Sequence, residues 1–131
     1  MGIVRSRIEN IKTRSNLEGL LDRSRKSPVF LLKHSSSCPI SASVLSAYEE
    51  FAQGQGGAHQ PWIYGLVRVN EERSLSDQLS ECLGVVHASP QLLLIINLKI
   101  IWHDSHWRLT LEKMEEVVNQ FLQASQGEDL I

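Results

Sequence analysis

The residues best suited to chemistry lie in the stretch KHSSSCPISAS, residues 33–43. It contains Cys38, which is followed directly by Pro39, and Ser41 stands three positions after the cysteine. Two cysteines at this spacing can close a disulfide during a redox cycle, whereas a cysteine and a serine cannot. A lone thiolate can still attack an existing disulfide. The spacing therefore indicates a single-thiol nucleophile at Cys38, with the Ser41 hydroxyl as an additional hydrogen-bond donor to it.

The flanking elements predict how Cys38 is activated. A short apolar run over residues 29–33 is typical of a buried strand, and a helix with apolar residues every three or four positions follows the serines. Pro39 suits the first position of that helix, which would make Cys38 its N-cap. Backbone amides and the helix dipole stabilise a thiolate there and lower its pKa below the free-thiol value of about 8.5. The alternative is that Cys38 fills space in the core, as free cysteines often do.

The other cysteine, Cys82, lies in a different setting. Residues from Ser74 onward predict a helix, with Ser74 as its N-cap and with Leu75, Leu79 and Leu83 on one face. Gly84 suits the left-handed position that follows the end of a helix. Because Cys82 falls on the same face, we predict that it is buried and unreactive. This helix is expected on the opposite side of the sheet from the helix that follows the reactive cysteine, so the two thiols should not form a disulfide.

Hydrophobic periodicity predicts an alternation of helices and strands. In chain order we expect a helix over 16–25 with Ser15 opening a capping box, a strand over 29–33, a helix from Pro39, a strand over 62–69, a helix from Ser74, strands over 92–96 and 100–103, and a helix capped by Thr110. The last two strands are joined too tightly for anything but an antiparallel hairpin. This order is that of an α/β, thioredoxin-like fold with a four-stranded mixed sheet and helices on both faces.

The turn of the predicted hairpin reads INLKI, with Leu98 at a position where a tight turn favours glycine. A positive φ is unfavourable for leucine because of its Cβ atom. The hairpin is therefore expected to have an unusual turn or to hold some backbone strain.

Composition and charge limit the classes of function. The chain has 131 residues, 42% of them hydrophobic and 21% charged, which suits one globular domain over residues 1–131. Residues 1–14 and 125–131 are expected to be poorly ordered. The formal net charge of −2 argues against nucleic acid or an anionic membrane as partner. Since no secretory signal or membrane-spanning run is evident, we expect a cytoplasmic protein with free thiols.

Three motifs carry a resemblance to a known family: HSSSCPIS (34–41), GVVHASPQ (84–91) and IWHDSHW (101–107). In this order they resemble the YtxJ-type family of bacillithiol-system proteins, the monothiol bacilliredoxins of the thioredoxin superfamily. The resemblance implies a bacterial cytosolic protein that removes the small thiol bacillithiol from mixed disulfides on proteins. It implies bacillithiol as co-substrate, no tightly bound cofactor and thiolated proteins as partners. It also implies that Cys38 is the reactive residue and that Pro90, after Ser89, is a cis-proline facing it.

Histidines and a tryptophan near these motifs are candidates for supporting roles. His34 lies four residues before Cys38, and Trp102 and His106 lie at the end of the last predicted strand. A zinc site formed by Cys38 and two histidines is one interpretation, but the spacing matches no established zinc motif. We therefore expect His103 and His106 to order the loop before the last helix by hydrogen bonds. Tryptophans such as Trp102 more often contribute packing than a substrate platform.

Three classes of function remain open at this stage. The first is a monothiol thiol–disulfide oxidoreductase, which we favour because the thiol lies at a predicted helix N-terminus. The second is carriage of a metal or an iron–sulfur cluster, with Cys38 as one ligand and small thiols as others. The third is a binding module on a thioredoxin scaffold without chemistry, since fold alone does not decide function.

Overall fold

The computed structural model describes residues 8–36, 39–54, 62–71, 73–86 and 88–129. Its elements in chain order are β1 (Ile8–Asn10), α1 (Arg14–Arg23), β2 (Val29–His34), α2 (Pro39–Gly54), β3 (Ile63–Arg68), α3 (Arg73–Leu83), β4 (Gln91–Ile96), β5 (Lys99–Ser105), the short helix η1 (His106–Arg108) and α4 (Leu111–Asp129). Every predicted strand and helix is present within a few residues of its expected bounds.

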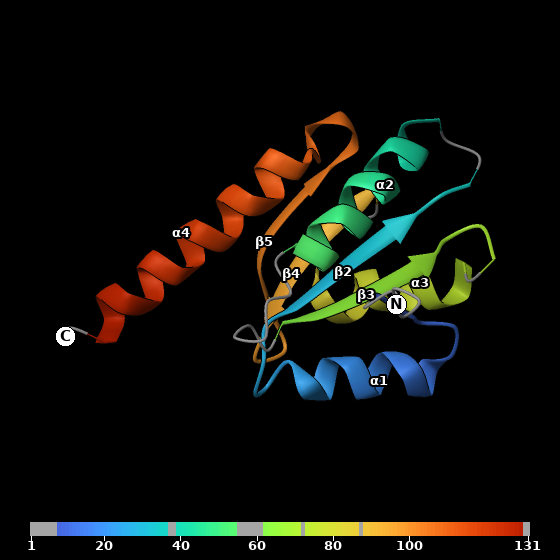
Figure 1. The fold of residues 1–131 in the computed structure, drawn as a ribbon. Helices are drawn as coiled ribbons and strands as arrows, with labels where there is room; N and C mark the ends of the chain where they lie inside the picture. Colours follow the sequence, from blue (N-terminus) through green and yellow to red (C-terminus); the bar gives the residue numbers. More distant parts are fainter. Residues whose placement is uncertain (1–7, 37–38, 55–61, 72, 87, 130–131) are drawn as a thin grey trace, which may run out of the picture.

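The strands form one mixed sheet in the order β1-β3-β2-β4-β5 (Figure 1). β3 runs parallel to both β1 and β2, whereas β4 runs antiparallel to both β2 and β5. The crossover through α2 makes β2 and β3 parallel, and the short turn makes β4 and β5 antiparallel, as predicted. The loops after β2, β3 and β5 and the loop before β4 therefore share one end of the sheet.

The predicted number of strands is wrong, because the sheet has five. The additional strand is β1, which pairs in parallel with Tyr64, Gly65 and Leu66 of β3 at the edge of the sheet. An ion pair between Glu9 and Arg23 also ties β1 to α1. A segment of 3 residues is too short to show a hydrophobic period. Only backbone pairing with a distant strand defines it.

The ends expected to be poorly ordered are residues 1–14 and 125–131, and the structure describes part of each. Residues 8–14 form β1 and the start of α1, and α4 continues to Asp129. Residues 1–7 and 130–131 lie outside the described residues.

The helices lie in two layers, one on each face of the sheet (Figure 1). Successive side chains of β2 point to opposite faces and pack against both layers. Phe30 and Leu32 pack in one core cluster with the apolar faces of α2 and α4. Val29 and Leu31 pack in a second cluster with those of α1 and α3. Helices therefore cover both faces as predicted, and Cys82 is on the opposite side from α2. Within the described residues, no helix is long and apolar enough to cross a membrane.

Tyr48 holds α2 against the sheet. Its buried hydroxyl donates toward the backbone oxygens of Phe30 on β2 and Gly65 on β3, at 3.1 and 2.9 Å. Because these oxygens belong to neighbouring strands, the contact seats α2 over the β2–β3 pair. The placement of α2 determines where the residues that precede it meet the sheet.

The N-cap predicted for α1 is wrong. The helix begins at Arg14 with Thr13 as its N-cap, and the Thr13 hydroxyl accepts a hydrogen bond from the Asn16 amide at 3.0 Å. The Asn16 side chain accepts one from the Thr13 amide in return. Ser15 and Glu18 have the spacing of a capping box, but the helix begins two residues earlier. Thr13 and Asn16 form the capping box instead.

The ends of the later helices agree with the sequence at two places and differ at one. Ser74 lies inside α3, which begins at Arg73, so it is not the N-cap. Gly84 follows α3 with a φ of 67°, the left-handed conformation predicted for it. The Thr110 hydroxyl accepts a hydrogen bond from the Lys113 amide at 3.1 Å, which confirms the predicted cap of α4.

The turn between β4 and β5 is left-handed at both central residues. Asn97 and Leu98 have φ values of 51° and 67°, as in a two-residue primed turn. The Ser24 backbone oxygen accepts a hydrogen bond from the Asn97 amide, and the Ser24 hydroxyl accepts one from the Leu98 amide. The predicted strain at Leu98 is therefore present, and docking of the turn on Ser24 helps to hold it.

Candidate functional site

The predicted site residues gather at the end of the sheet where β2 and β3 finish. His34, at the end of β2, pairs with Arg68 at the end of β3. One row earlier, Lys33 lies opposite Gln91 of β4, which lies opposite Ser105 of β5. Residues that directly continue these strands therefore lie along the same edge of the sheet: Ser35, Ser89, Pro90 and His106.

The segment before β4 has the geometry that the resemblance implied. The peptide bond between Ser89 and Pro90 is cis. The backbone oxygen of Pro90 accepts a hydrogen bond from the His106 amide at 2.9 Å, which fixes this segment to the end of β5. Pro90 is buried and Ser89 is half-buried.

The start of α2 is joined directly to the end of β2. The helix begins at Pro39, as predicted, and Ser41 is fully buried in its first turn. The Ser41 hydroxyl oxygen accepts a hydrogen bond from the Ser35 amide at 3.3 Å. Cys38 lies outside the described residues, so its role as N-cap and its hydrogen bond from Ser41 stay predictions.

Asn70 connects the loop after β2 with the loop after β3, and the sequence reasoning did not find it. Its side-chain oxygen accepts a hydrogen bond from the Ser36 amide at 2.8 Å. Asparagine is a common turn residue, and Asn70 directly follows a predicted strand. That position was the one feature of the sequence that could have indicated a role for Asn70 in the turn. The contact links the chain just before Cys38 to the start of α3.

His34 contributes a neutral imidazole to this edge. Burial lowers the pKa of its side chain below the usual 6.5, and the positive charge of Arg68 lowers it further. A backbone hydrogen bond with Ser41 and the charge of Glu49 act in the other direction but are smaller. Among the described residues, no group makes a hydrogen bond with Nδ1 of His34.

The remaining predicted supporting residues differ in position. His106 is exposed at the edge, with Nδ1 3.1 Å from the Ser105 hydroxyl. Its role in ordering the loop before α4 stays a prediction. Trp102 pairs with Leu94, three ladder pairs away from the edge, and packs against the first core cluster. The structure therefore brings His106 to the site edge, whereas Trp102 contributes packing.

Cys82 is exposed, which contradicts the prediction that it is buried. The buried residues of α3 are Leu75, Ser76 and Leu79. These three residues define the face of α3 that packs against the sheet. Cys82 lies at the edge of that face, where its side chain is exposed. There it borders a surface cleft together with Glu18 and Leu21.

Lys33 is a buried cation that the sequence reasoning overlooked. Its side chain is 0% exposed on the α3 side of β2, and its ammonium group donates a hydrogen bond to the Ser80 hydroxyl at 3.1 Å. Burial lowers the pKa of Lys33 to about 8, against an opposing effect from the charge of Asp77. A lysine inside an otherwise apolar strand was the available signal.

Within the described residues, no three histidine, cysteine, aspartate or glutamate side chains gather into a group that could hold a metal ion. The zinc site considered from the sequence needed Cys38, which lies outside these residues. That interpretation is therefore not tested by the structure.

Comparisons with known proteins agree with this architecture. The family model for the monothiol bacilliredoxin BrxC matches residues 9–114. One solved structure, of a thioredoxin-fold protein that has been proposed to be an oxidoreductase, is 25% identical with a TM-score of 0.72 and covers 83% of this chain and 91% of its own.

Two thioredoxins share the fold at lower identity. Malassezia sympodialis thioredoxin (Mala s 13) is 12% identical with a TM-score of 0.72, covering 92% of this chain and 95% of its own. Fasciola hepatica thioredoxin is 16% identical with a TM-score of 0.69, covering 86% and 97%. The fold is therefore a thioredoxin fold, and the family match supports a role of the thiol oxidoreductase type. Because the family model covers most of the sequence, from β1 through the cysteine motif and the cis-proline to the start of α4, this chain belongs to the monothiol bacilliredoxin family.

Proposed function

We propose that this protein is a monothiol oxidoreductase that removes bacillithiol from mixed disulfides on proteins, with Cys38 as its nucleophile. Family membership supports the reaction class. The observation that carries the single-thiol mechanism is Ser41, a buried hydroxyl bound to the Ser35 amide at the position where a dithiol enzyme has its second sulfur. Pro39 at the start of α2 supports the nucleophile, because a thiolate just before a helix is stabilised by its dipole.

The reaction proceeds in two balanced exchanges. The Cys38 thiolate attacks the bacillithiol sulfur of a protein–bacillithiol disulfide, so that a Cys38–bacillithiol disulfide forms and the protein thiolate leaves and takes up a proton. The thiolate of a second bacillithiol then attacks the bacillithiol sulfur on Cys38. Oxidised bacillithiol leaves and the Cys38 thiolate is restored. Bacillithiol is therefore a co-substrate, and the electron balance requires no bound cofactor.

The residues at the sheet edge support these steps in different ways. Ser41 holds the two ends of the Cys38 loop together through Ser35. His34, whose pKa is lowered by burial, contributes a neutral side chain at the same edge of the sheet. The Ser89–Pro90 segment, held to β5 through the His106 amide, forms the neighbouring wall.

The proposal is tested with a protein that carries one bacillithiol mixed disulfide. We expect the wild type and Cys82→Ser, in the presence of bacillithiol, to remove the adduct at equal rates, as measured by intact mass. Cys38→Ser should leave the adduct in place. A parallel reaction tests the identity of the small thiol. In it, glutathione replaces bacillithiol both in the mixed disulfide on the substrate protein and as the added reducing thiol. Equal removal by Cys38→Ser and wild type would contradict the proposal.

A further inference from the structure

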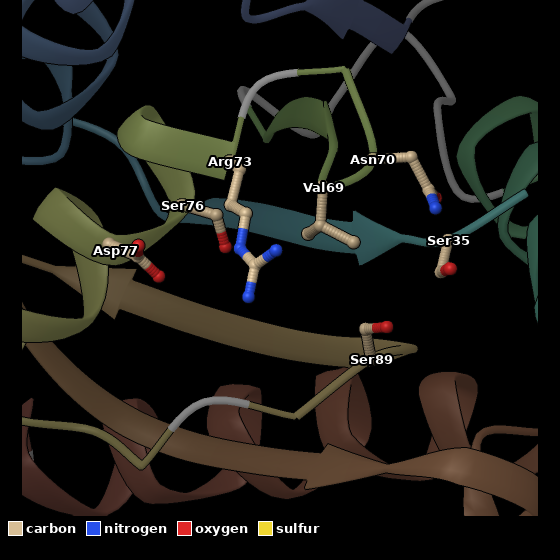
Figure 2. A pocket seen from close by; sticks show the side chains of 7 residues that line it. All are labelled: Ser35, Val69, Asn70, Arg73, Ser76, Asp77 and Ser89. Atoms are coloured by element: carbon tan, nitrogen blue, oxygen red, sulfur yellow. The ribbon is translucent and has the colours of Figure 1, made fainter.

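A polar cleft of about 340 Å³ lies on the α3 side of the sheet, at the end where β2 and β3 finish (Figure 2). Its volume is in the range of small-molecule sites. Its polar lining comes from the ends of strands and from the first turns of α3: Ser35, Asn70, Arg73, Ser76, Asp77 and Ser89. Two of these residues also belong to the candidate site, since Ser35 bonds to Ser41 and Ser89 precedes the cis-proline.

The cleft has one cation whose charge is not balanced. Figure 2 shows the guanidinium of Arg73 directed into the space between α3 and Ser89. Among the described residues, Arg73 has no ion pair or hydrogen bond. Asp77 is the acidic residue of the lining, and its charge also acts on the buried ammonium group of Lys33, so one carboxylate lies near two cations. Arg73 is therefore left to attract an anion from solution.

The residues beneath the cleft are polar as well. Lys33 and Gln91 pair across the sheet, and Ser35 and Ser89 come two residues further along on the same face. Gln91 is 2% exposed, and its side-chain oxygen has no hydrogen-bond partner within the described residues. Buried acceptors are normally satisfied, so a buried water is expected near this oxygen.

We propose that this cleft binds the anionic part of the low-molecular-weight thiol whose sulfur reacts with Cys38. This inference rests on the proposed function and adds a recognition site to it. Arg73 pairs with a carboxylate of the thiol, while the hydroxyls of Ser35 and Ser89 and the amide of Asn70 bind its hydroxyl groups. The Ser36–Asn70 hydrogen bond ties the wall of the cleft to the chain just before Cys38, which places recognition beside the chemistry.

The first test compares an anionic with an uncharged disulfide in a Cys82→Ser background. The Cys38 thiolate attacks oxidised bacillithiol, which yields Cys38–bacillithiol disulfide and one bacillithiol thiolate, and it attacks hydroxyethyl disulfide in the same way. We expect Arg73→Gln to lower the ratio of the two rate constants about three- to tenfold at low salt, as loss of a charge-assisted contact predicts. The wild-type ratio should fall toward that of the variant as salt screens the charge.

Arg25→Gln is the matched control, because Arg25 is an exposed cation that pairs with Asp22 before β2, at the opposite end of the sheet. It should leave the ratio unchanged. An Arg73→Gln ratio equal to that of wild type, or an equal decrease for both variants, would overturn the proposal.

A second test measures binding without the reaction, in Cys38→Ser. We expect added bacillithiol to shift the NMR amide signals of Asn70, Arg73 and Ser76, and not those of Arg25. Shifts at these residues combined with no bacillithiol removal by the wild type would support the cleft and contradict the proposed function. An absence of shifts at millimolar bacillithiol would overturn the cleft, whether or not the enzyme is active.

Discussion

The Ser35 amide and the Ser41 hydroxyl, 3.3 Å apart, join the end of β2 to the first turn of α2, one on each side of Cys38 in the sequence. In a dithiol enzyme the residue at position 41 would carry the second sulfur. Here it is a fully buried hydroxyl that accepts a backbone hydrogen bond. Ser41 therefore links the start of α2 to the end of β2. Because it has no sulfur, it cannot resolve a mixed disulfide at Cys38 by forming an intramolecular disulfide.

Ser41→Cys should change the product of oxidation. A cysteine one helical turn after Cys38 can resolve the mixed disulfide within the chain. In a Cys82→Ser background, oxidation with a small disulfide should add the mass of the small thiol to the parent protein, whereas Ser41→Cys should mostly lose two hydrogens. Ser41→Ala is the control and should keep the adduct. A Cys38–Cys82 disulfide in the oxidised wild type would contradict the placement of α3.

Lys33→Met should stabilise the protein at neutral pH. Burial lowers the pKa of Lys33 from 10.5 to about 8, a cost to the folded state of at most about 3 kcal/mol. We expect the free energy of unfolding at pH 7 to rise by about 1–3 kcal/mol, because a matched apolar side chain often replaces a buried charge without loss. Urea denaturation measures the change.

The pH dependence makes the Lys33 prediction specific. Between pH 8 and 10.5 the unfolded chain binds more protons than the folded chain, so wild-type stability gains with rising pH. The difference in unfolding free energy between Lys33→Met and wild type should therefore decrease from pH 8 to pH 10.5. Lys26→Met, at an exposed position, should show neither the gain nor this decrease. A constant destabilisation at every pH would show that Lys33 stabilises the fold through the Ser80 contact.

His34 should make the fold sensitive to acid. Because its pKa is lowered from 6.5 in the folded state, the unfolded chain binds an additional proton as the pH falls through 6.5. Wild type should therefore lose more stability between pH 7.5 and 5.5 than His34→Asn does, by up to about 1.4 kcal/mol per pH unit. His106→Asn, at an exposed histidine, should retain the wild-type dependence. Parallel curves for wild type and His34→Asn would contradict the burial argument.

Leu98→Gly should stabilise the β4–β5 hairpin. Leu98 has a φ of 67°, and left-handed backbone costs a side-chain-bearing residue about 1–2 kcal/mol. Glycine removes that cost but loses about 0.5–1 kcal/mol of chain entropy, so we expect a net gain of about 0.5–1 kcal/mol in thermal or urea unfolding. Lys99→Gly, in the adjoining strand, should instead destabilise the protein. A lower stability of Leu98→Gly would indicate that packing of the leucine outweighs the strain.

The sequence alone determined the order of the four helices and of strands β2 to β5, and the position of the cysteine motif. Hydrophobic periods, Pro39 and Gly84 act over a single turn or strand, so they could be interpreted without the fold. The motif resemblance added the cis-proline at Pro90, which the structure contains.

Tertiary structure decided the features that depend on contacts between distant segments. β1 exists as a strand through pairing with β3, and Cys82 is exposed because α3 turns other residues toward the sheet. The lowered pKa of Lys33 depends on burial, opposed by the charge of Asp77, and α3 brings Asp77 to Lys33 only when it packs on β2. The cleft with Arg73 likewise requires the ends of β2, β3 and α3 to meet. Local patterns predict local conformation, whereas burial, ionisation and cavities arise only when segments far apart in sequence come into contact.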